Sequence, residues 1–501
     1  MLKKIIQIVK GEGKTVSGKT SQASKRVEVP VSQHHINRDL IDPRAIETVE
    51  TLQDAGFETY IVGGAVRDLL LGLEPKDFDI ATEATPEEVK RLFRRAFIIG
   101  RRFRIVHVIF GSGREHEVFE VSTFRANVDA ADATKVKGNE RSKSKLEGLT
   151  HAVDSSGRVL RDNVWGDIAS DAARRDFTVN AMYYDPSSEV VVDYHGGIGD
   201  AKKHVIRMIG EPAARYREDP VRIIRAVRFS AKLAKLGFKL EPKTLEPIKK
   251  LKKLLEDVPP SRMFDEMLKL VQTGHSLASI QTLKELGLER GIYPLLDVIV
   301  ERSDSPMVKG MLGDTDARVK AGKPVAPSYL LACVLWQDVI DGWTARREGT
   351  KPFNKIPTFP ALAESVDAVF EERIGDVSGR GKLGADMREI WMMQPRFEKR
   401  VGSSPHTLVE HLRFRAGFDF LRLRGECGAE FGEANAAELA ELAAWWQDFQ
   451  DADHAGRMAL IEQARLQPKT AGATDAKSTK PRRKRKPRTN SNGDGLPSAG
   501  I

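Results

Sequence analysis

The stretch that decides the fold is Tyr60–Thr82, YIVGGAVRDLLLGLEPKDFDIAT. Its pattern predicts a strand, a glycine turn, a short helix, a loop and a second strand. Gly63 and Gly64 leave backbone N–H groups uncovered just before the helix begins, and Arg67 follows one turn later. Such a helix start attracts phosphate, because its free donors and its partial positive charge both favour an anion. The stretch therefore predicts a phosphate cradle.

Three acidic residues follow this cradle. Asp77 and Asp79 are two residues apart in a predicted strand, so both carboxylates should point the same way and could share a metal. Glu120 stands in EVFEVSTFR, an alternating segment that predicts another strand. A carboxylate between apolar neighbours must be satisfied, and a metal would do this. Two solvated surface acids and a rim glutamate paired with an arginine remain alternatives, but the order of the motifs favours a nucleotidyl-transfer site.

Length, charge and cysteine content limit the class of protein. A chain of 501 residues is too long for one core, so several domains are expected. The formal net charge of +9 favours a polyanionic partner, nucleic acid above membrane. Two cysteines, Cys333 and Cys427, lie far apart and indicate a reducing, cytoplasmic setting. No apolar run is long enough to span a bilayer.

A long helix after Asp219-Pro220 carries arginine at every third position. Arg222, Arg225 and Arg228 should fan over one side of it. A salt-bridged surface is one interpretation of this pattern. No acid stands four residues after any of them, however, which favours a nucleotide triphosphate or an RNA backbone as their partner.

Composition divides the chain into ordered regions and polar segments. The region after residue 240 is predicted to be helical, and the run from Lys480 to Arg488 indicates a nucleic-acid tether or a localisation signal. The predicted divisions are a disordered basic arm (1–35), a catalytic head (36–210) with a mobile loop (126–158), a first helical region binding nucleotide and RNA (211–298), a second binding RNA (299–466), and a disordered basic tail (467–501).

Three motifs in order, GGAVRDLLLG…KDFDIAT, ARRDFTVNAMYYD and REDPVRIIRAVRF, resemble the class II nucleotidyltransferases. This family contains the bacterial poly(A) polymerases and the CCA-adding tRNA nucleotidyltransferases, and the resemblance covers about residues 55–270. The segment IIGRRFRIVHVIF and the basic tail resemble the polymerase branch. The resemblance implies an α+β nucleotidyltransferase head with a mixed five-stranded sheet, followed by an all-α neck and body.

The resemblance also implies roles for individual residues. Asp77, Asp79 and Glu120 would hold two Mg²⁺ ions, and Asp176 is sometimes counted among the essential acids of the family. The implied nucleotide-binding residues are Gly63, Gly64, Arg67, Arg175, Asp219, Arg222, Arg225 and Arg228.

Within that set, Gly64 and Arg67 would contact the triphosphate. Asp219 and Arg222 occupy the positions that pair with the incoming base in CCA-adding relatives.

The implied activity is template-independent addition of AMP from ATP to single-stranded RNA 3′ ends by two-metal in-line transfer, as in mRNA polyadenylation that promotes decay. A CCA-adding enzyme would share every acid named above, so it remains an alternative. An alternative of another class is a catalytically silent RNA-binding protein on the same fold. RNA-decay proteins are candidate partners of the basic tail.

Overall fold

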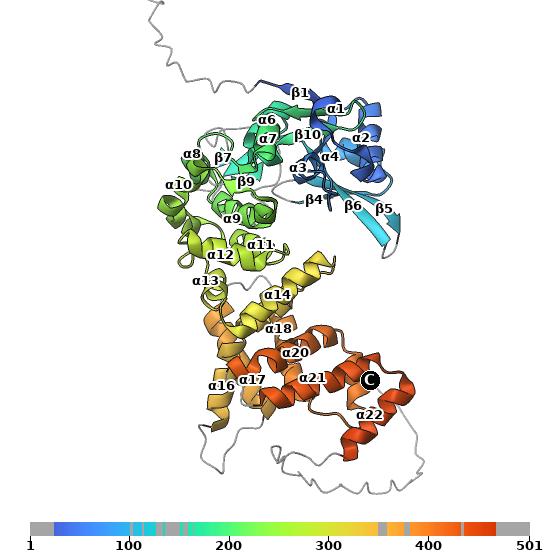
Figure 1. The fold of residues 1–501 in the computed structure, drawn as a ribbon, viewed down its shortest axis with the longest axis vertical. Coiled ribbons are helices and arrows are strands. Elements are labelled where there is room, and N and C mark those ends of the chain that lie inside the picture. Colours follow the sequence, from blue (N-terminus) through green and yellow to red (C-terminus); the bar gives the residue numbers. More distant parts are fainter. Residues whose placement is uncertain are drawn as a thin grey trace, which may run out of the picture.

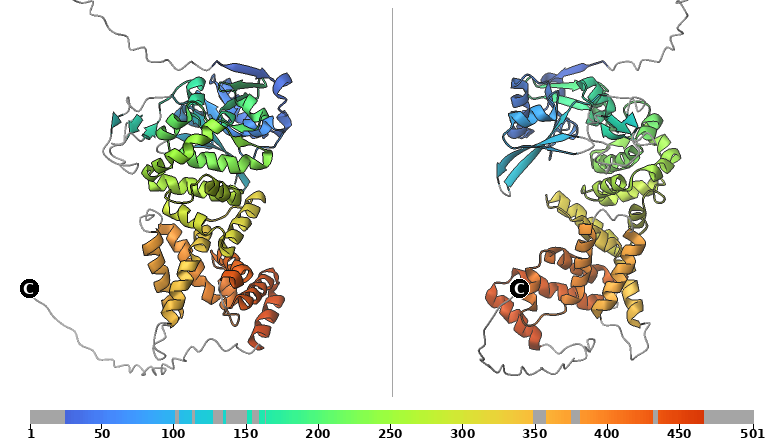
Figure 2. Two further views of the ribbon diagram at one scale, coloured as in Figure 1. Left: turned by 60° about the vertical axis from the view of Figure 1, so that its left-hand side comes forward. Right: turned by 180° about the vertical axis from the view of Figure 1, so that it is seen from behind.

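The computed structural model describes residues 25–100, 104–112, 115–126, 134–135, 151–153, 159–162, 164–348, 358–374, 381–431 and 435–466. These residues form an elongated molecule, with a sheet-containing head at one end and a stack of helices extending from it (Figure 1). Views from two further sides show the same separation (Figure 2).

The head is built on a mixed eight-stranded sheet in the order β1-β11-β10-β2-β3-β6-β5-β4. Strands β3 and β6 run parallel, and the other neighbouring pairs are antiparallel. The strands are β1 (Val27–Pro30), β2 (Thr59–Val62), β3 (Asp79–Thr82), β4 (Ala96–Ile99), β5 (Ile105–Ser112), β6 (Glu115–Thr123), β10 (Met182–Asp185) and β11 (Val190–Asp193). The predicted mixed sheet followed by helices is confirmed, but five strands is the wrong number, because β1 and the β10–β11 hairpin extend one edge of the sheet.

Helices pack against both faces of this sheet, but over a larger part of one face than of the other. On the covered face lie α2 (Pro43–Asp54), which Asp42 caps, and α4 (Pro86–Leu92), which begins with a capping box. Their apolar residues and those of the strands form one buried cluster. On the second face, α6 (Ile168–Arg174) and Phe124 pack only over the half that contains β2, β3, β10 and β11.

The N-terminal arm enters the head fold earlier than predicted. Residues 27–34 form β1 and α1 (Val31–His34), so the prediction of a disordered arm over residues 1–35 is wrong for this part. Strand β1 is ordered because it pairs with β11, and the composition of β1 alone does not predict this pairing. His34 is buried, with its Nε2 2.9 Å from the Glu189 carbonyl oxygen and its ring edge-on to Tyr184. Residues 1–24 lie outside the described part of the chain.

Replacing His34 tests this correction. We expect His34→Ala to lower the free energy of unfolding of the head by about 1–3 kcal/mol, because it removes a buried hydrogen bond and the amide of Ile36 also loses its acceptor on the ring. Thermal unfolding would measure the change. His35→Asn is the control, since His35 is exposed and asparagine tolerates its φ of 56°. Equal shifts in both variants would contradict the interpretation.

The predicted mobile loop at 126–158 contains regular structure. Strands β7 (Thr134–Lys135) and β8 (His151–Val153) form a three-stranded sheet with β9 (Val159–Asp162). The prediction of a mobile loop is therefore wrong for these strands. Backbone pairing between the strands orders them, and the polar composition gives no sign of it. The rest of the loop lies outside the described residues.

The rest of the described chain is almost entirely helical. One buried apolar cluster runs from Phe177 in the head to Leu423 in α20, so the head and the helices share a continuous core. The helices are α8 (Pro212–Glu218), α9 (Val221–Leu233), α10 (Pro242–Leu251), α11 (Pro260–Val271), α12 (Ser276–Glu285), α13 (Pro294–Glu301), α14 (Pro306–Lys320), α15 (Pro327–Val334), α16 (Trp336–Glu348), α17 (Thr358–Val369), α18 (Gly381–Met393), α19 (Ser404–Val409), α20 (Phe414–Phe431), α21 (Ala436–Asp451) and α22 (His454–Leu466). None of the described helices is long and apolar enough to cross a membrane. The boundaries at 211–298 and 299–466 stay predictions, and the predicted tail at 467–501 lies outside the described residues.

Candidate active site

The strand register brings two of the predicted acids together. Asp79 is the first residue of β3 and is paired with Glu120 on the parallel strand β6. Neighbouring strands lie about 4.8 Å apart and paired residues share a face, so the two carboxylates stand side by side. Asp77 lies two residues before β3 begins, so the expectation that one strand holds both aspartates is wrong. It is nevertheless close enough to act electrostatically on Asp79.

Asp79 lies in a field of like charge. Its side chain is accessible to solvent, but surrounding protein atoms exclude part of the water around the carboxylate. This partial desolvation raises the pKa of Asp79, the charges of Glu120 and Asp77 raise it further, and Arg175 and Lys232 oppose the shift. Converging carboxylates of this kind suit a divalent cation. Within the described residues, however, no three His, Cys, Asp or Glu side chains are arranged closely enough to form a complete metal-binding group.

The glycine turn approaches Asp79 closely. Gly63 has a φ of 81°, and a Cβ placed on it would lie 3.8 Å from Asp79 Oδ2 and 3.8 Å from Arg175 Nη1. A side chain here would be strained by the positive φ and would lie in van der Waals contact with both groups. The Gly63 amide donates to the Met182 carbonyl oxygen at 3.3 Å, so it is not a free donor for phosphate. The backbone of the turn therefore leaves open space beside Asp79, while the phosphate cradle stays a prediction.

Arg67 differs from its predicted place. Its side chain is 1% exposed, and it donates to Asp68 Oδ1 and, from Nη1, to Asn180 Oδ1 at 2.6 Å. In this conformation it is engaged within the head and is not available to a triphosphate. Its direct contact with a ligand stays a prediction, and the structure shows it supporting the glycine turn from within.

Arg175 directs its guanidinium toward Gly63 and Asp79. It donates to Asp171 Oδ2 at 3.0 Å and to the Tyr183 hydroxyl at 3.1 Å, and its guanidinium lies 5.3 Å from the Tyr183 ring centroid. These contacts fix its orientation with Nη1 toward Gly63. Burial lowers the pKa of Arg175, but Tyr183 and Asp171 outweigh burial and raise it overall, so the residue stays cationic.

Asp176 joins the head to helix α9. Its Oδ1 accepts a bond from Arg222 Nε at 2.8 Å, and its Oδ2 accepts one from Arg225 Nη1 at 2.7 Å. Burial raises the pKa of Asp176, but the two arginines outweigh burial and hold it below its ordinary value. Both oxygens are thus occupied by arginines, and a role as a catalytic acid stays a prediction.

The two predicted base-pairing residues are also engaged. Arg222 is 9% exposed in its side chain and further donates to the Arg215 carbonyl oxygen and to Glu218. Asp219 accepts from Arg262 at 2.5 Å, while its Oδ1 is buried without a partner among the described groups. Pairing of these residues with a base therefore remains a prediction, for which Asp219 Oδ1 offers an unused acceptor.

Arg228 and Lys232 on α9 have N–H donors that no described group accepts. Arg228 comes only within 4.0 Å of Glu266, and its Nε is buried with no acceptor in the described part of the chain. Lys232, one turn further, makes no ion pair or hydrogen bond with any described residue and interacts electrostatically with Asp77 and Asp79. Sequence reasoning missed Lys232, although it continues the spacing of Arg225 and Arg228 along one helical face.

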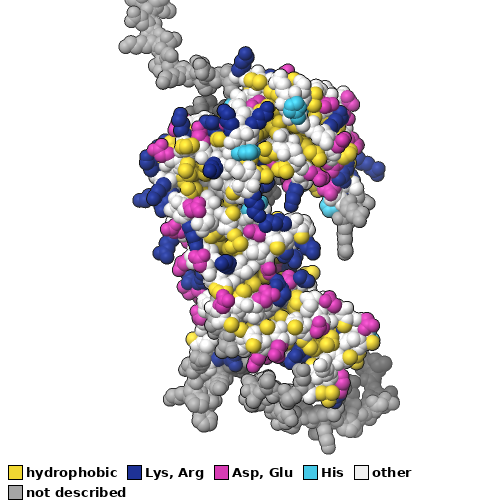
Figure 3. Space-filling view, in the orientation of Figure 1, with side chains coloured by type: hydrophobic (Ala, Val, Ile, Leu, Met, Phe, Trp, Pro, Cys, Tyr) yellow, Lys and Arg dark blue, Asp and Glu magenta, His cyan; other side chains and the backbone are white. Residues whose placement is uncertain are grey.

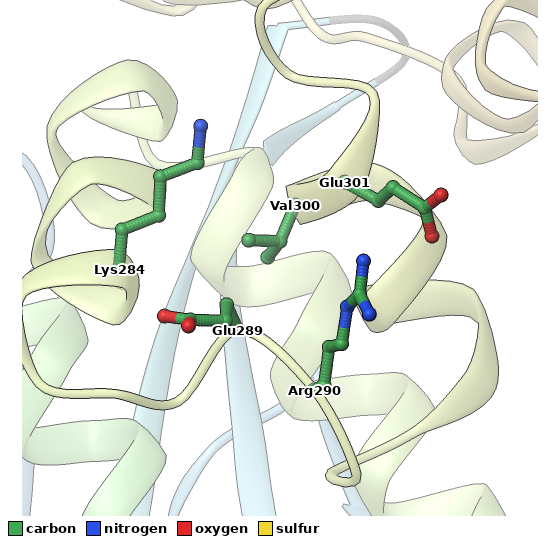
Figure 4. A pocket seen from close by; sticks show the side chains of 5 residues that line it. All are labelled: Lys284, Glu289, Arg290, Val300 and Glu301. Atoms are coloured by element: carbon green, nitrogen blue, oxygen red, sulfur yellow. The ribbon is translucent and has the colours of Figure 1, made fainter.

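A separate pocket lies between α12 and α13 (Figure 4). It has a volume of about 380 Å³ and is lined by Lys284, Glu289, Arg290, Val300 and Glu301. Its acidic and basic groups balance, and it contains none of the predicted site residues. Lys and Arg side chains instead gather around the hollow between the head and the helices beneath it (Figure 3). This hollow, and not the pocket, suits a polyanion.

The fold and the site define the class of this protein. Residues 59–207 match the family described as "Poly A polymerase head domain". Residues 237–299 match "Probable RNA and SrmB- binding site of polymerase A", and residues 354–490 match "Polymerase A arginine-rich C-terminus". A mixed sheet with paired acids and a glycine turn, within a matching head domain, defines a nucleotidyltransferase.

Curated relatives define the family more narrowly. Poly(A) polymerase I of Escherichia coli O157:H7 is 40% identical over 447 residues, covering 87% of this chain and 90% of the relative. Poly(A) polymerase I of Haemophilus influenzae is 38% identical over 460 residues, covering 90% and 95%. The CCA-adding enzyme of Bacillus subtilis is 35% identical over 266 residues, covering only 52% and 59%. The chain belongs to the bacterial poly(A) polymerase I family, whose enzymes carry out template-independent poly(A) addition.

Proposed function

We propose that this chain adds AMP from ATP to RNA 3′ ends, with Asp77, Asp79 and Glu120 as its catalytic acids. Family membership supports the reaction, and the pairing of Asp79 with Glu120 is the observation that supports the site. In this proposal the three carboxylates would hold two Mg²⁺ ions, which when bound would activate the 3′-hydroxyl and neutralise charge on the triphosphate.

The cations around the acids have separate tasks in this proposal. Arg175, held by Asp171 and Tyr183, faces the glycine turn and would bind the triphosphate. Arg228 and Lys232 approach from α9 with unused donors and would bind the triphosphate of ATP as well as stabilise the departing pyrophosphate. Preorganised charges of this kind need no rearrangement as the reaction proceeds.

In this proposal Asp176 would position helix α9 and would not itself react. By binding Arg222 and Arg225 it fixes α9 against the head, and Glu266 accepts from Arg225 on the other side at 3.3 Å. A base pocket between the head and α9 would therefore be rigid. A pocket whose buried polar groups match one base rejects the others, because a wrong base leaves those groups unpaired.

An extension assay with separate nucleotides tests the function. With ATP alone, we expect a long homopolymer on a single-stranded RNA primer. Incorporation of two CMP and then one AMP on tRNA would instead indicate a CCA-adding enzyme. Absence of any incorporation, with RNA still bound, would indicate a silent RNA-binding protein.

Lys232 offers a sharper test of the site. We expect Lys232→Ala to raise the KM for ATP about tenfold, because it removes a charge-assisted contact worth about 1.5 kcal/mol. Steady-state extension at saturating RNA would measure this. Lys235→Ala is the matched control, since Lys235 is exposed on the next turn. An unchanged KM in Lys232→Ala would remove this residue from the site.

The basic tail would supply RNA affinity without sequence preference. We expect deletion of residues 471–501 to weaken RNA binding and to reduce its dependence on salt, because the cationic run is lost. Binding titrations at several salt concentrations would show this, and an unchanged salt slope would exclude the tail as an RNA contact. A cytoplasmic location and RNA-decay partners at the tail belong to the same proposal.

A further inference from the structure

A single row of residues crosses the sheet from the catalytic acids to its edge. Asp79 on β3 is paired with Glu120 on β6, Glu120 with His107 on β5, and His107 with Phe97 on the edge strand β4. Residues paired directly across strands point to the same face. These four side chains therefore form one line, about three strand spacings or roughly 14 Å long.

Among the described residues, no helix packs over this face in the part of the sheet beyond Glu120. Its alternate residues, such as Val106 and Val121, are buried against the helices on the covered side. On the opposite side, Phe97 is 55% exposed and Val118 is 40% exposed. Helix α6 and Phe124 shield only the half of this face that contains β2, β3, β10 and β11. We call the uncovered half, marked by Phe97, His107, Ile109 and Val118, the open face; in Figure 1, β5 and β6 extend freely from the head.

The chemistry of the open face suits bases and does not suit phosphate. Phe97 offers an aromatic ring, and Ile109 and Val118 offer apolar surface. The described residues of β4, β5 and β6 include no lysine or arginine on this face, and Arg95, just before β4, donates to the Gly111 carbonyl oxygen of β5. His107 lies between Phe97 and Glu120, with its Nε2 3.4 Å from Glu120 Oε1 and without a hydrogen bond to any described group. Aromatic and apolar surfaces stack nucleobases, and every base has a face that can stack.

We propose that the open face is a stacking platform for the terminal bases of the RNA 3′ end. This inference rests on the proposed function, which requires a 3′-hydroxyl at Asp79 and Glu120. Gly63 and Arg175 occupy the other side of Asp79, where the triphosphate is proposed to lie. The acceptor strand then reaches the acids from the β6 side, across His107 and Phe97. A protein bound on this face would obstruct the acids, so RNA is the favoured occupant.

A fluorescence measurement without ATP tests the platform separately from catalysis. The full chain would be titrated with single-stranded RNAs carrying 2-aminopurine at the last or the next-to-last position. We expect quenching with the unmodified protein, and its loss in Phe97→Ala. Phe97→Tyr, which keeps the ring, should retain the quenching. Leu92→Ala is the matched control, because Leu92 is 39% exposed on α4 at the covered side. Unchanged quenching in Phe97→Ala would overturn the proposal.

A double-mutant cycle excludes an indirect effect. We expect Phe97→Ala to raise the KM for an oligoadenylate primer about tenfold or more, with the KM for ATP unchanged. With a primer whose terminal nucleotides lack their bases, Phe97→Ala should not raise the KM for the primer any further. The contribution of Phe97 should also be independent of salt, unlike that of the tail.

The outcomes separate the platform from the function. Additive effects of Phe97→Ala and base removal, with normal AMP incorporation, would overturn the platform and leave the proposed function intact. Quenching by an unmodified protein that never incorporates AMP would support the platform and contradict the function.

Discussion

Asp79→Asn is expected to reduce AMP incorporation at least about a thousandfold while RNA binding stays unchanged. Asp79 is paired with Glu120, feels the charge of Asp77 and lies next to the glycine turn, so the proposed site depends on it more than on the other acids. Asparagine keeps the shape of the side chain and removes the charge. The loss should therefore appear in kcat, because the charge acts on the reacting groups more than on bound RNA.

Single-turnover extension and a separate RNA titration would measure the two effects. Asp54→Asn is the matched control, since Asp54 is exposed at the end of α2 and distant in the chain from the acids. The fold should not suffer from Asp79→Asn, because removing a repelling charge relieves strain among the three acids. Near-normal incorporation in Asp79→Asn would remove Asp79 from the mechanism.

Asp176→Asn is expected to have the largest effect on stability. The carboxylate of Asp176 holds Arg222 and Arg225, and the three side chains are 15%, 9% and 29% exposed. Asparagine would leave the two largely buried arginines with only Glu218 and Glu266 as acidic partners, and breaking a buried ion pair costs about 3 kcal/mol. Helix α9 would then lose its attachment to the head, and the extension activity should fall with it.

Calorimetric or urea unfolding would measure the change. Glu246→Gln is the matched control, because its pair with Lys250 is exposed on both sides and contributes little. Equal stability of Asp176→Asn and the unmodified chain would show that the two arginines find other partners.

The stabilising effect of Asp176 should depend on pH in a defined direction. The folded-state pKa of Asp176 lies below its ordinary value of 3.8, so its contribution is complete above that value. It is lost as the pH falls below about 4 toward the folded-state pKa. The difference in stability between the unmodified chain and Asp176→Asn should therefore be constant near neutral pH and shrink in acid. A difference that grew in acid would contradict this.

Local signals determined much of the head. The glycine turn, the capping box before α4 and the alternating strands were predictable because each depends on neighbours in sequence. The strands that local patterns predicted, β2, β3 and β6, are present, and the resemblance implied a sheet of five strands. The three added strands were not predictable in the same way: β1 follows a basic segment, and only its pairing with β11 orders it. Pairing over such a distance leaves no local pattern.

The sequence by itself determined which chemical groups are available: three acids, a glycine turn and a helix with arginine at every third position. Only the tertiary structure decided what each group faces. It placed Glu120 beside Asp79 through strand register, and it buried Arg67 within the head. It also neutralised Arg222 and Arg225 with acids far away in sequence, so that unused donors remain further along α9. Spacing along a helix fixes the direction of a side chain, whereas its charge partner depends on which other elements pack against that helix.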